Sequence, residues 1–280
     1  MLMPEVETRV GHADWAENQF RGYAVNRDLV GKDGWASIVS LAVSGRRVEG
    51  NDAAVLEDVA VCALAADPRI WPVKVARLVS AFGSPLLGLA AGHAALEGAL
   101  MGPVPTGGAA KMLMGLRERL GDRVEDPATM EQVLDDLLSK GRVSGFGVAF
   151  RGVDERVVAM KARLHVHARD GGVYWRLIMA LDGIMERKKN LHVNFSMATA
   201  AILLDLGYTP DEITLIMSTY LDVCFYANVH EGAQQRSDVL RRLPDACVEY
   251  VGRAARLSPR AEAKRTLDSQ APVLSDTSYR

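Results

Sequence analysis

Hydrophobic residues along this chain recur mainly with the spacing of an α-helix. Between Asp126-Pro127 and Gly141 they occupy every third or fourth position, as Met130, Val133, Leu134, Leu137 and Leu138. An aspartate before a proline is a typical helix start, and a glycine is a typical helix end. Thr209-Pro210 begins a second helix in the same way, and Glu212 completes a capping box with the threonine.

Comparable helical patterns cover much of the remaining chain. They extend over residues 86–101, 107–120, 155–167, 173–187 and 195–206, and a further one starts at Asn51 or Asp52 and stops before Asp67-Pro68. Alternating strand patterns are scarce. We therefore predict an all-α fold.

Two regions depart from this pattern. Alanine and glycine are concentrated between Ala91 and Gly108, and small side chains let helix axes come close, so we expect a tightly packed helix pair there. Residues 256–280 are rich in Arg, Ser, Ala and Pro and have no apolar stripe. We expect a mobile tail, the alternative being a segment that orders across a dimer.

Composition excludes several classes of function. With 49% hydrophobic and 24% charged residues the chain is typical of a soluble globular protein, and a net charge of −2 gives no basic surface for nucleic acid. There is no apolar run long enough to span a membrane and no signal core at the N-terminus. Cys62, Cys224 and Cys247 lack metal or disulfide spacing and are predicted to be buried thiols, so we expect a cytoplasmic protein.

One segment combines a glycine turn with charged residues and carries the most information about function. It begins Gly145-Phe146-Gly147-Val148 and continues to Asp154-Glu155-Arg156. This segment resembles the citrate synthase signature, in which a glycine–aromatic–glycine turn is followed by a catalytic histidine and then by Asp-Pro-Arg. The histidine position here holds Val148, whose side chain neither transfers a proton nor donates a hydrogen bond.

Other segments resemble the same family and occur in the family's order. They are Arg21-Gly22-Tyr23, Ser44-Gly45-Arg46, Gly102 to Ala109, Val193-Asn194-Phe195-Ser196, and Leu240 to Pro244 with Val248 to Gly252. The similarity spans Gln19 to Gly252, and the short chain favours the citryl-CoA lyase-like branch of the superfamily.

The resemblance implies a large helical domain with a smaller helical domain, assembled as a homodimer. On this basis we expect residues 15–255 to form the citrate synthase-like domain. The smaller subdomain would lie at roughly 120–205 within it, and residues 256–280 would form the tail.

The resemblance also implies a mechanism whose residues are replaced here. In the family an aspartate removes a proton beside the thioester, one histidine stabilises the enolate, and a second histidine polarises the other substrate. The matching positions are Ser196, Thr106 (or Pro105, if the inserted residue is placed differently) and Val148. None of these side chains is an acid or base near neutral pH, so we expect the usual citrate-forming mechanism to be absent.

The family's binding residues are partly retained. Arg156 matches an arginine that contacts a substrate carboxylate, the alternative being a salt bridge to a neighbouring acid. Gly145, Phe146 and Gly147 match the turn whose backbone receives the coenzyme A adenine, the alternative being a simple tight turn. Arg241 or Arg242 matches a late arginine that reaches the neighbouring subunit's site.

Two further positions bear on the ligand and one on the chemistry. Asn194 belongs to the substrate-binding set that the resemblance implies, whereas the family's mid-region arginine falls at Leu221, which argues against a tricarboxylate. Histidine is the side chain best suited to proton transfer near neutral pH, and His192 is our candidate substitute.

We expect no metal and no permanently bound cofactor. His165 and His167 lie two residues apart on a predicted helix and so point to different sides, and no third ligand is evident.

These observations leave two main hypotheses. In the first, the protein is an enzyme that acts on a coenzyme A thioester of a carboxylic acid, as a carbon–carbon lyase or transferase or by thioester chemistry, without the usual His/His/Asp mechanism. In the second, it is a non-catalytic acyl-CoA-binding paralogue, or a silent subunit in a hetero-oligomer with an active relative. A helical scaffold without a ligand is a third, weaker alternative.

Overall fold

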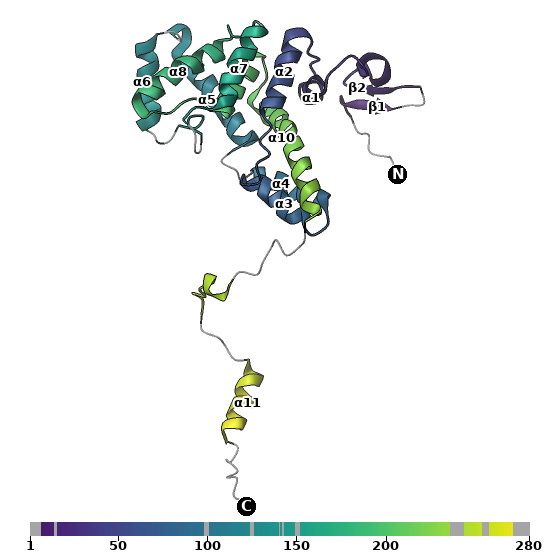
Figure 1. The fold of residues 1–280 in the computed structure, drawn as a ribbon, viewed down its shortest axis with the longest axis vertical. Helices are drawn as coiled ribbons and strands as arrows, with labels where there is room; N and C mark the ends of the chain where they lie inside the picture. The colour runs from purple at the N-terminus through teal and green to yellow at the C-terminus, as the bar shows by residue number, and fades with distance from the viewer. Residues whose placement is uncertain are drawn as a thin grey trace, which may run out of the picture. The chain divides into compact units, whose positions relative to one another are not determined.

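Helices form most of the described chain, which confirms the predicted all-α class (Figure 1). The computed structural model describes residues 7–13, 16–97, 101–123, 126–139, 141, 143–148, 152–235, 244–253 and 258–270. The chain falls into two compact units, Met1–Val239 and Leu240–Arg280. The first unit ends at Val239, before the predicted domain end at residue 255. The smaller subdomain expected at roughly 120–205 stays a prediction.

The helices of the first unit lie close to the ranges that the hydrophobic spacing predicts. They are α1 (Trp35–Ser44), α2 (Gly50–Cys62), α3 (Trp71–Ser80), α4 (Pro85–Glu97), α5 (Pro103–Leu120), α6 (Pro127–Ser139), α7 (Glu155–Val166), α8 (Val173–Lys189), α9 (Phe195–Asp205) and α10 (Pro210–Ala233), with a 3₁₀ turn η2 (Gly121–Arg123) after α5. The spacing analysis gave no range for α1 or α3. The N-caps of these helices, Gly34 and Ile70, make no side-chain capping bond, so a polar start signal is absent at both.

A small antiparallel sheet precedes the helices. β1 (Gly11–Ala13), β2 (Asn18–Phe20) and β3 (Tyr23–Ala24) pair in that order, with Gly11 opposite Phe20 and Phe20 opposite Tyr23. A π-helical turn, η1 (Val25–Leu29), follows. Strands of two or three residues are too short to show an alternating pattern, which is why the sequence did not reveal them.

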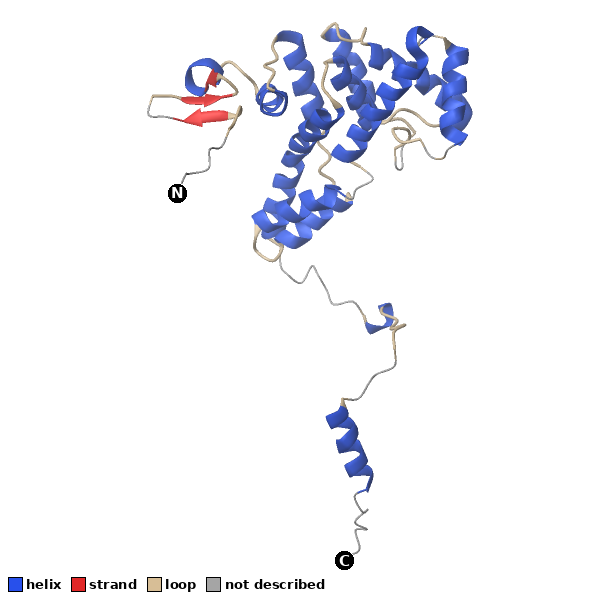
Figure 2. Ribbon diagram, turned by 180° about the vertical axis from the view of Figure 1, so that it is seen from behind, coloured by secondary structure: helices blue, strands red, loops and turns tan. Residues whose placement is uncertain are grey.

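The long helix α10 connects the two ends of the first unit (Figures 1 and 2). It packs against α3 and α4 at one end and against α1, α2, α5 and α9 along the rest of its length. Its start carries the predicted capping box, because the Glu212 N–H donates to Thr209 Oγ1 at 3.3 Å and the Thr209 N–H donates to Glu212 Oε2 at 2.8 Å. A second layer is formed by α9 between α5 and α8.

Gly92 and Gly107, two of the small residues between Ala91 and Gly108, lie at tight helix contacts, as predicted. A Cβ on Gly92 would lie 2.8 Å from the Ala76 Cβ of α3 and 2.8 Å from the Phe225 ring of α10. A Cβ on Gly107 would clash with the Thr214 hydroxyl of α10. Glycine is therefore required where α4 and α5 approach their neighbours.

Two arginines from the family-like segments hold structural positions. Arg21 donates to the Ala42 carbonyl of α1 at 2.6 Å. The Arg46 guanidinium lies 4.3 Å from the centre of the Tyr208 ring and donates to the Leu206 carbonyl at 3.1 Å. Arg21 therefore holds the turn between β2 and β3 to α1, and Arg46 connects the segment after α1 to the α9–α10 turn.

The Asp154 carboxylate joins the starts of α7 and α9 and is fully buried. Its Oδ1 accepts from the Arg156 N–H at 3.1 Å and from Arg156 Nε at 2.8 Å. Its Oδ2 accepts from Arg156 Nη2 at 2.8 Å and from the Phe195 N–H at 2.9 Å. Burial acts to raise the pKa of Asp154, but the Arg156 guanidinium and the two N–H groups outweigh it and hold the pKa below its ordinary value.

A second carboxylate caps α8 from a distant part of the chain. Asp205, the last residue of α9, accepts from the Tyr174 N–H at 2.9 Å and from the Trp175 N–H at 2.8 Å. Gly172 leaves the space for this carboxylate, since a Cβ there would overlap Asp205 Oδ2. The start of α8 is thereby tied to the end of α9.

The second unit contains a 3₁₀ turn, η4 (Asp245–Cys247), and α11 (Pro259–Gln270). The helix α11 lies within the segment predicted as a tail, and its side chains are mostly exposed where they are described. Whether this segment is mobile or orders across a dimer stays a prediction.

A test of the α8 cap compares two neighbouring glycines. Gly172→Ala should lower the free energy of unfolding by about 1–2 kcal/mol, because the methyl group displaces the capping carboxylate. Gly171→Ala meets no atom within 4 Å and should be neutral or stabilising by up to about 1 kcal/mol. Urea unfolding of both variants measures the difference, and equal stabilities would show that Asp205 does not need this space.

Asp154→Asn should destabilise the protein by about 3 kcal/mol. One accepting oxygen becomes an NH2 group that faces other hydrogen-bond donors, and the Arg156 guanidinium loses its charged partner. The matched control is Asp126→Asn at the exposed start of α6, where asparagine caps nearly as well as aspartate. The pKa of Asp154 is lower in the folded protein than in the unfolded chain. The ionised carboxylate therefore contributes its full stabilisation of the fold above the ordinary pKa near 4, and this stabilisation is lost as the pH falls through the folded pKa. The stability gap between wild type and Asp154→Asn should be constant from about pH 7 to 5 and shrink below about pH 4. A gap that widens in acid contradicts this account.

Candidate functional site

The candidate site is a cavity of about 180 Å³ lined by α10, by residues of α3, α4, α5, α7 and α9, and by the loops that precede α3 and α5; we call it the central cavity. Most of its wall is apolar, including Val73 of α3, Leu96 of α4, and Met217, Leu221 and Phe225 of α10. Its polar lining comes from Thr106, Arg156, Ser196 and the Cys224 thiol. Thr106 and Ser196, two of the three positions predicted to replace the family's catalytic residues, therefore lie in one cavity with Arg156.

Thr106 lies in the first turn of α5 and is buried. Its hydroxyl donates to the Gly102 carbonyl one turn earlier at 2.8 Å. The hydroxyl proton is therefore already used in a hydrogen bond within the helix start. Toward a ligand in the cavity, the hydroxyl oxygen acts mainly as an acceptor.

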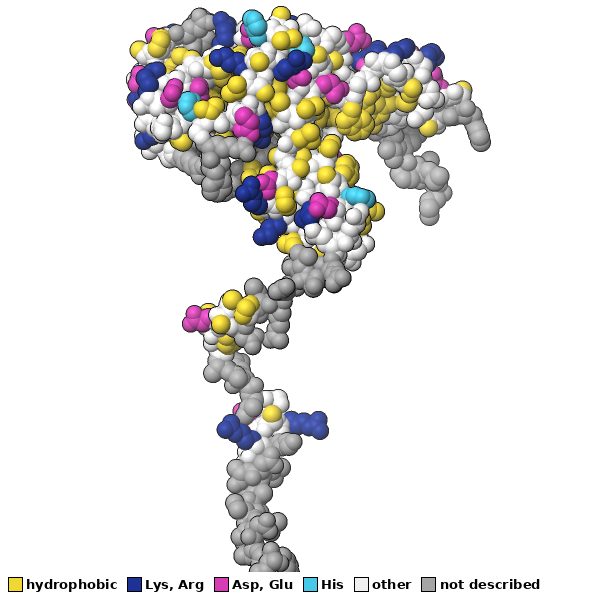
Figure 3. All heavy atoms as spheres, in the orientation of Figure 1, with side chains coloured by type: hydrophobic (Ala, Val, Ile, Leu, Met, Phe, Trp, Pro, Cys, Tyr) yellow, Lys and Arg dark blue, Asp and Glu magenta, His cyan; other side chains and the backbone are white. Residues whose placement is uncertain are grey.

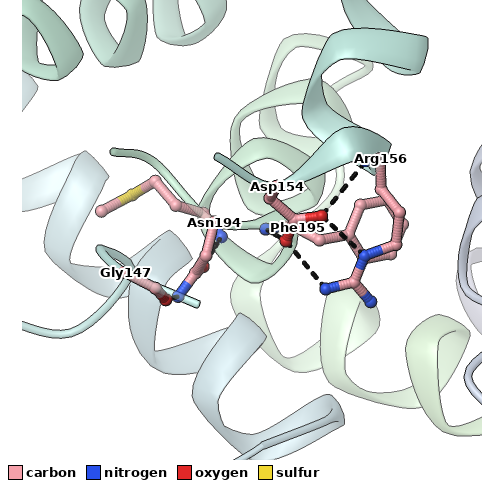
Figure 4. Close-up of polar contacts among 6 residues, drawn as sticks. Gly147, Asp154, Arg156, Asn194 and Phe195 are labelled. Carbon is pink, nitrogen blue, oxygen red and sulfur yellow. Dashed lines mark hydrogen bonds and ion pairs between the residues drawn. The ribbon is translucent and has the colours of Figure 1, made fainter. Parts of the chain in front are cut away.

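Arg156 forms the salt bridge that the sequence left as one alternative, and its predicted contact with a substrate carboxylate stays a prediction. Its guanidinium forms a bidentate pair with Asp154 and lies 4.7 Å from the centre of the Phe195 ring, as Figure 4 shows. It also lines the central cavity. Since Asp154 takes Nε and Nη2, the positive charge at the wall is already balanced by a buried carboxylate.

Asn194 has a structural role at the start of α9. Its side-chain oxygen accepts from the Met197 N–H at 3.2 Å, and its Nδ2 donates to the Gly147 carbonyl at 3.3 Å (Figure 4). It is not among the residues that line the central cavity. Its predicted part in substrate binding stays untested, whereas its capping of α9 positions Ser196 two residues later.

The glycine turn is held by the segment before α9. Gly145 and Gly147 have φ angles of 95° and 81°, which favour glycine. The Gly147 N–H donates to the His192 carbonyl at 2.7 Å, and the Asn194 N–H donates to the Gly145 carbonyl at 2.9 Å. These bonds account for the turn as a local structure, while the role of Gly145, Phe146 and Gly147 with adenine remains a prediction.

Val148 follows this turn and is half-buried, and it does not line the central cavity. Of the three predicted positions, the structure therefore brings Thr106 and Ser196 together and leaves Val148 outside the described lining of the central cavity. Arg241 and Arg242 lie outside the described residues.

His192, the candidate substitute, also lies apart from the central cavity. Its Nδ1 is 3.3 Å from Asp182 Oδ2 and its Nε2 is 3.8 Å from Glu186 Oε1, both on α8. Asp182 also accepts from the Val193 N–H at 2.6 Å. These contacts favour a structural role for His192 in fixing the segment before α9.

Sequence analysis missed the role of Cys224 as a cavity residue. Its Sγ accepts from the Ala65 N–H at 3.0 Å, and burial raises the pKa of the thiol. The sequence signal is that Cys224 follows Met217 and Leu221 at helical spacing on α10. The prediction of three buried thiols is right for Cys224 alone, because Cys62 is half-buried and Cys247 is exposed.

No aspartate, glutamate or histidine is among the described residues that line the central cavity. His93 lies behind the lining residue Phe225: its ring centre is 5.1 Å from that of Phe225, and its Nε2 is 2.5 Å from Asp222 Oδ1.

Within the described ranges, no group of three or more His, Cys, Asp or Glu residues is placed to hold a metal. There, too, no helix combines the length and apolar character needed to cross a bilayer.

Solved structures with this fold include enzymes of citrate metabolism. Citryl-CoA lyase from Hydrogenobacter thermophilus matches with a TM-score of 0.76 and 22% identity over 92% of this chain and 99% of that one. ATP citrate lyase from Methanosaeta concilii, solved as a D541A mutant with (3S)-citryl-CoA, matches with a TM-score of 0.71 and 16% identity over 94% of this chain and 44% of its own. Citrate synthase from Thermotoga maritima MSB8 matches with a TM-score of 0.57 and 24% identity over 78% of this chain and 57% of its own. These similarities show the fold.

No curated protein sequence matches the chain. The family model for the citrate synthase C-terminal domain matches residues 74–242. That range contains Thr106, Arg156 and Ser196 of the central cavity together with the glycine turn. The match covers more than half of the chain and agrees with both the motif order and the fold, and the chain belongs to the citrate synthase family.

Proposed function

We propose that this protein binds a coenzyme A thioester of a carboxylic acid and acts on it by carbon–carbon bond chemistry or thioester chemistry without the usual His/His/Asp mechanism. The observation that carries the proposal is the central cavity, where Arg156 lies with Thr106 and Ser196 at family positions. Two ATP citrate lyases with this fold were solved with (3S)-citryl-CoA or with citrate and coenzyme A. Those ligands support the choice of ligand class for this chain.

The side chains at the cavity limit the chemistry that we assign to it. A hydroxyl and a guanidinium polarise a carbonyl oxygen by hydrogen bonding, and such donors stabilise charge that develops in a dry site. We assign this role to Ser196 and Arg156, since the Thr106 proton is committed to Gly102. Removal of a proton from carbon needs a positioned base, so we assign no such step to the lining residues.

The second candidate function is a non-catalytic acyl-CoA-binding paralogue or a silent subunit of an active relative. The observation that favours it is that the described cavity lining contains no acidic side chain and no histidine. The two candidates share the ligand and differ in turnover, so one set of measurements separates them.

We also propose that the protein is cytoplasmic and assembles as a homodimer, or as a hetero-oligomer with a paralogue. Large apolar side chains are exposed on α4, on α10 and in the α3–α4 turn, including Phe82, Leu86, Leu87, Val223 and Tyr226. Figure 3 shows hydrophobic side chains among charged and other side chains over this region on one face. An apolar surface of this kind supports a buried interface.

Arg156→Lys should weaken binding of an acyl-CoA thioester about tenfold, because lysine keeps the charge but loses the planar fork that holds Asp154 and faces the cavity. The matched control is Arg163→Lys, at another α7 arginine paired with an aspartate, Asp58, but outside the cavity lining. Calorimetric titration with coenzyme A and a panel of acyl-CoA thioesters measures affinity, and release of free thiol or carbon–carbon products measures turnover. We expect turnover by the wild type; binding without turnover of any thioester supports the silent paralogue, and the absence of both rejects the ligand class.

The paired substitution Leu86→Glu and Leu87→Glu should convert the expected dimer to a monomer, since it places two charges in the apolar surface. Val158→Glu, at a single exposed apolar position on α7, should leave the assembly unchanged. Light scattering on purified protein measures the mass. A monomeric wild type contradicts the proposed assembly.

A further inference from the structure

The charge balance of the central cavity restricts what can enter it. Arg156 is the cation in the described lining, and its Nε and Nη2 are held by the fully buried Asp154. The net charge that the pair offers to a ligand is therefore close to zero. A carboxylate carried on the far part of a ligand would lose its hydration without gaining a cation.

Most of the remaining described lining is apolar. Leu221 and Met217 of α10 lie on it with Leu96 of α4, and Phe195 presents its ring beside the guanidinium. Contact with such a wall favours methylene groups by about 0.8 kcal/mol for each one buried. The lining therefore favours binding of hydrocarbon groups and disfavours binding of charged groups.

The volume sets the size of the group. An apolar protein cavity of about 150 Å³ holds a benzene molecule. The central cavity, at about 180 Å³, accommodates a chain of about four to six carbons.

We propose that the central cavity holds an uncharged acyl chain of about four to six carbons and discriminates against chains that end in a second carboxylate. This inference rests on the proposed function for the thioester and adds the class of acyl group. The substrate class then differs from the carboxylate-rich ligands named for the solved relatives.

The experiment compares ligands of equal carbon number that differ by one carboxylate. Butanoyl-CoA should bind at least tenfold more tightly than succinyl-CoA, with coenzyme A alone as the reference for the shared part. The free acids hexanoate and hexanedioate form a second pair that does not depend on coenzyme A. Binding of the acids in this order without binding of coenzyme A or either thioester would reject the proposed function and keep the present inference.

Two substitutions probe the wall. Leu221→Arg adds a cation at a partly exposed cavity position and should remove or reverse the preference for butanoyl-CoA over succinyl-CoA, whereas Leu221→Met should keep it. Ala65→Leu should weaken hexanoate binding at least fivefold by filling the cavity, and Ala66→Leu, at the exposed neighbour outside the lining, should not. Thermal melting confirms that each variant is folded.

Equal or tighter binding of the dicarboxylate member in both pairs overturns the inference. So does the absence of binding by all four compounds to folded wild-type protein. An unchanged preference in folded Leu221→Arg shows that the wall at this position does not set the selection and likewise counts against it.

Discussion

The buried Asp154 carboxylate is the interaction on which the rest of the site depends. It caps α7, accepts the first N–H of α9 and neutralises Arg156, using both oxygens for four hydrogen bonds. A carboxylate without partners would be costly at this depth, so the two helix starts and the guanidinium must come together for the fold to form. The same arrangement fixes Arg156 and Ser196 on the cavity wall.

This constraint shows which parts of the site the fold itself requires. The pair between Asp154 and Arg156 and the cap at Asn194 are structural requirements of α7 and α9. Thr106 and Ser196 carry no comparable structural duty toward other elements, since the Thr106 hydroxyl is bonded within its own helix. Replacement at such positions alters reactivity at little cost to the scaffold, whereas replacement of Asp154 would disturb both helices.

The cavity draws its lining from helices that are far apart in the chain. Helices that contribute to it approach their neighbours at Gly92 and Gly107, and those contacts depend on the absence of side chains. Its polarity comes from a few positions on α5, α7, α9 and α10. Leu221 leaves the wall apolar at its position, and Arg156, the cation in the described lining, is already paired with Asp154.

The sequence by itself determined the features that depend on residues close together along the chain. Periodicity gave the helical class, Thr209 with Glu212 and Asp126 with Pro127 marked helix starts, and the order of short motifs indicated the family. Only the tertiary structure decided which side chains meet at one cavity. It placed Cys224 beside Thr106 and Ser196 and directed Asn194 and His192 to local hydrogen bonds, while Val148 lies outside the lining. The reason is physical: such meetings depend on the rotation and closeness of helices far apart in the chain, which packing at residues such as Gly92 and Asp154 sets and local spacing does not encode.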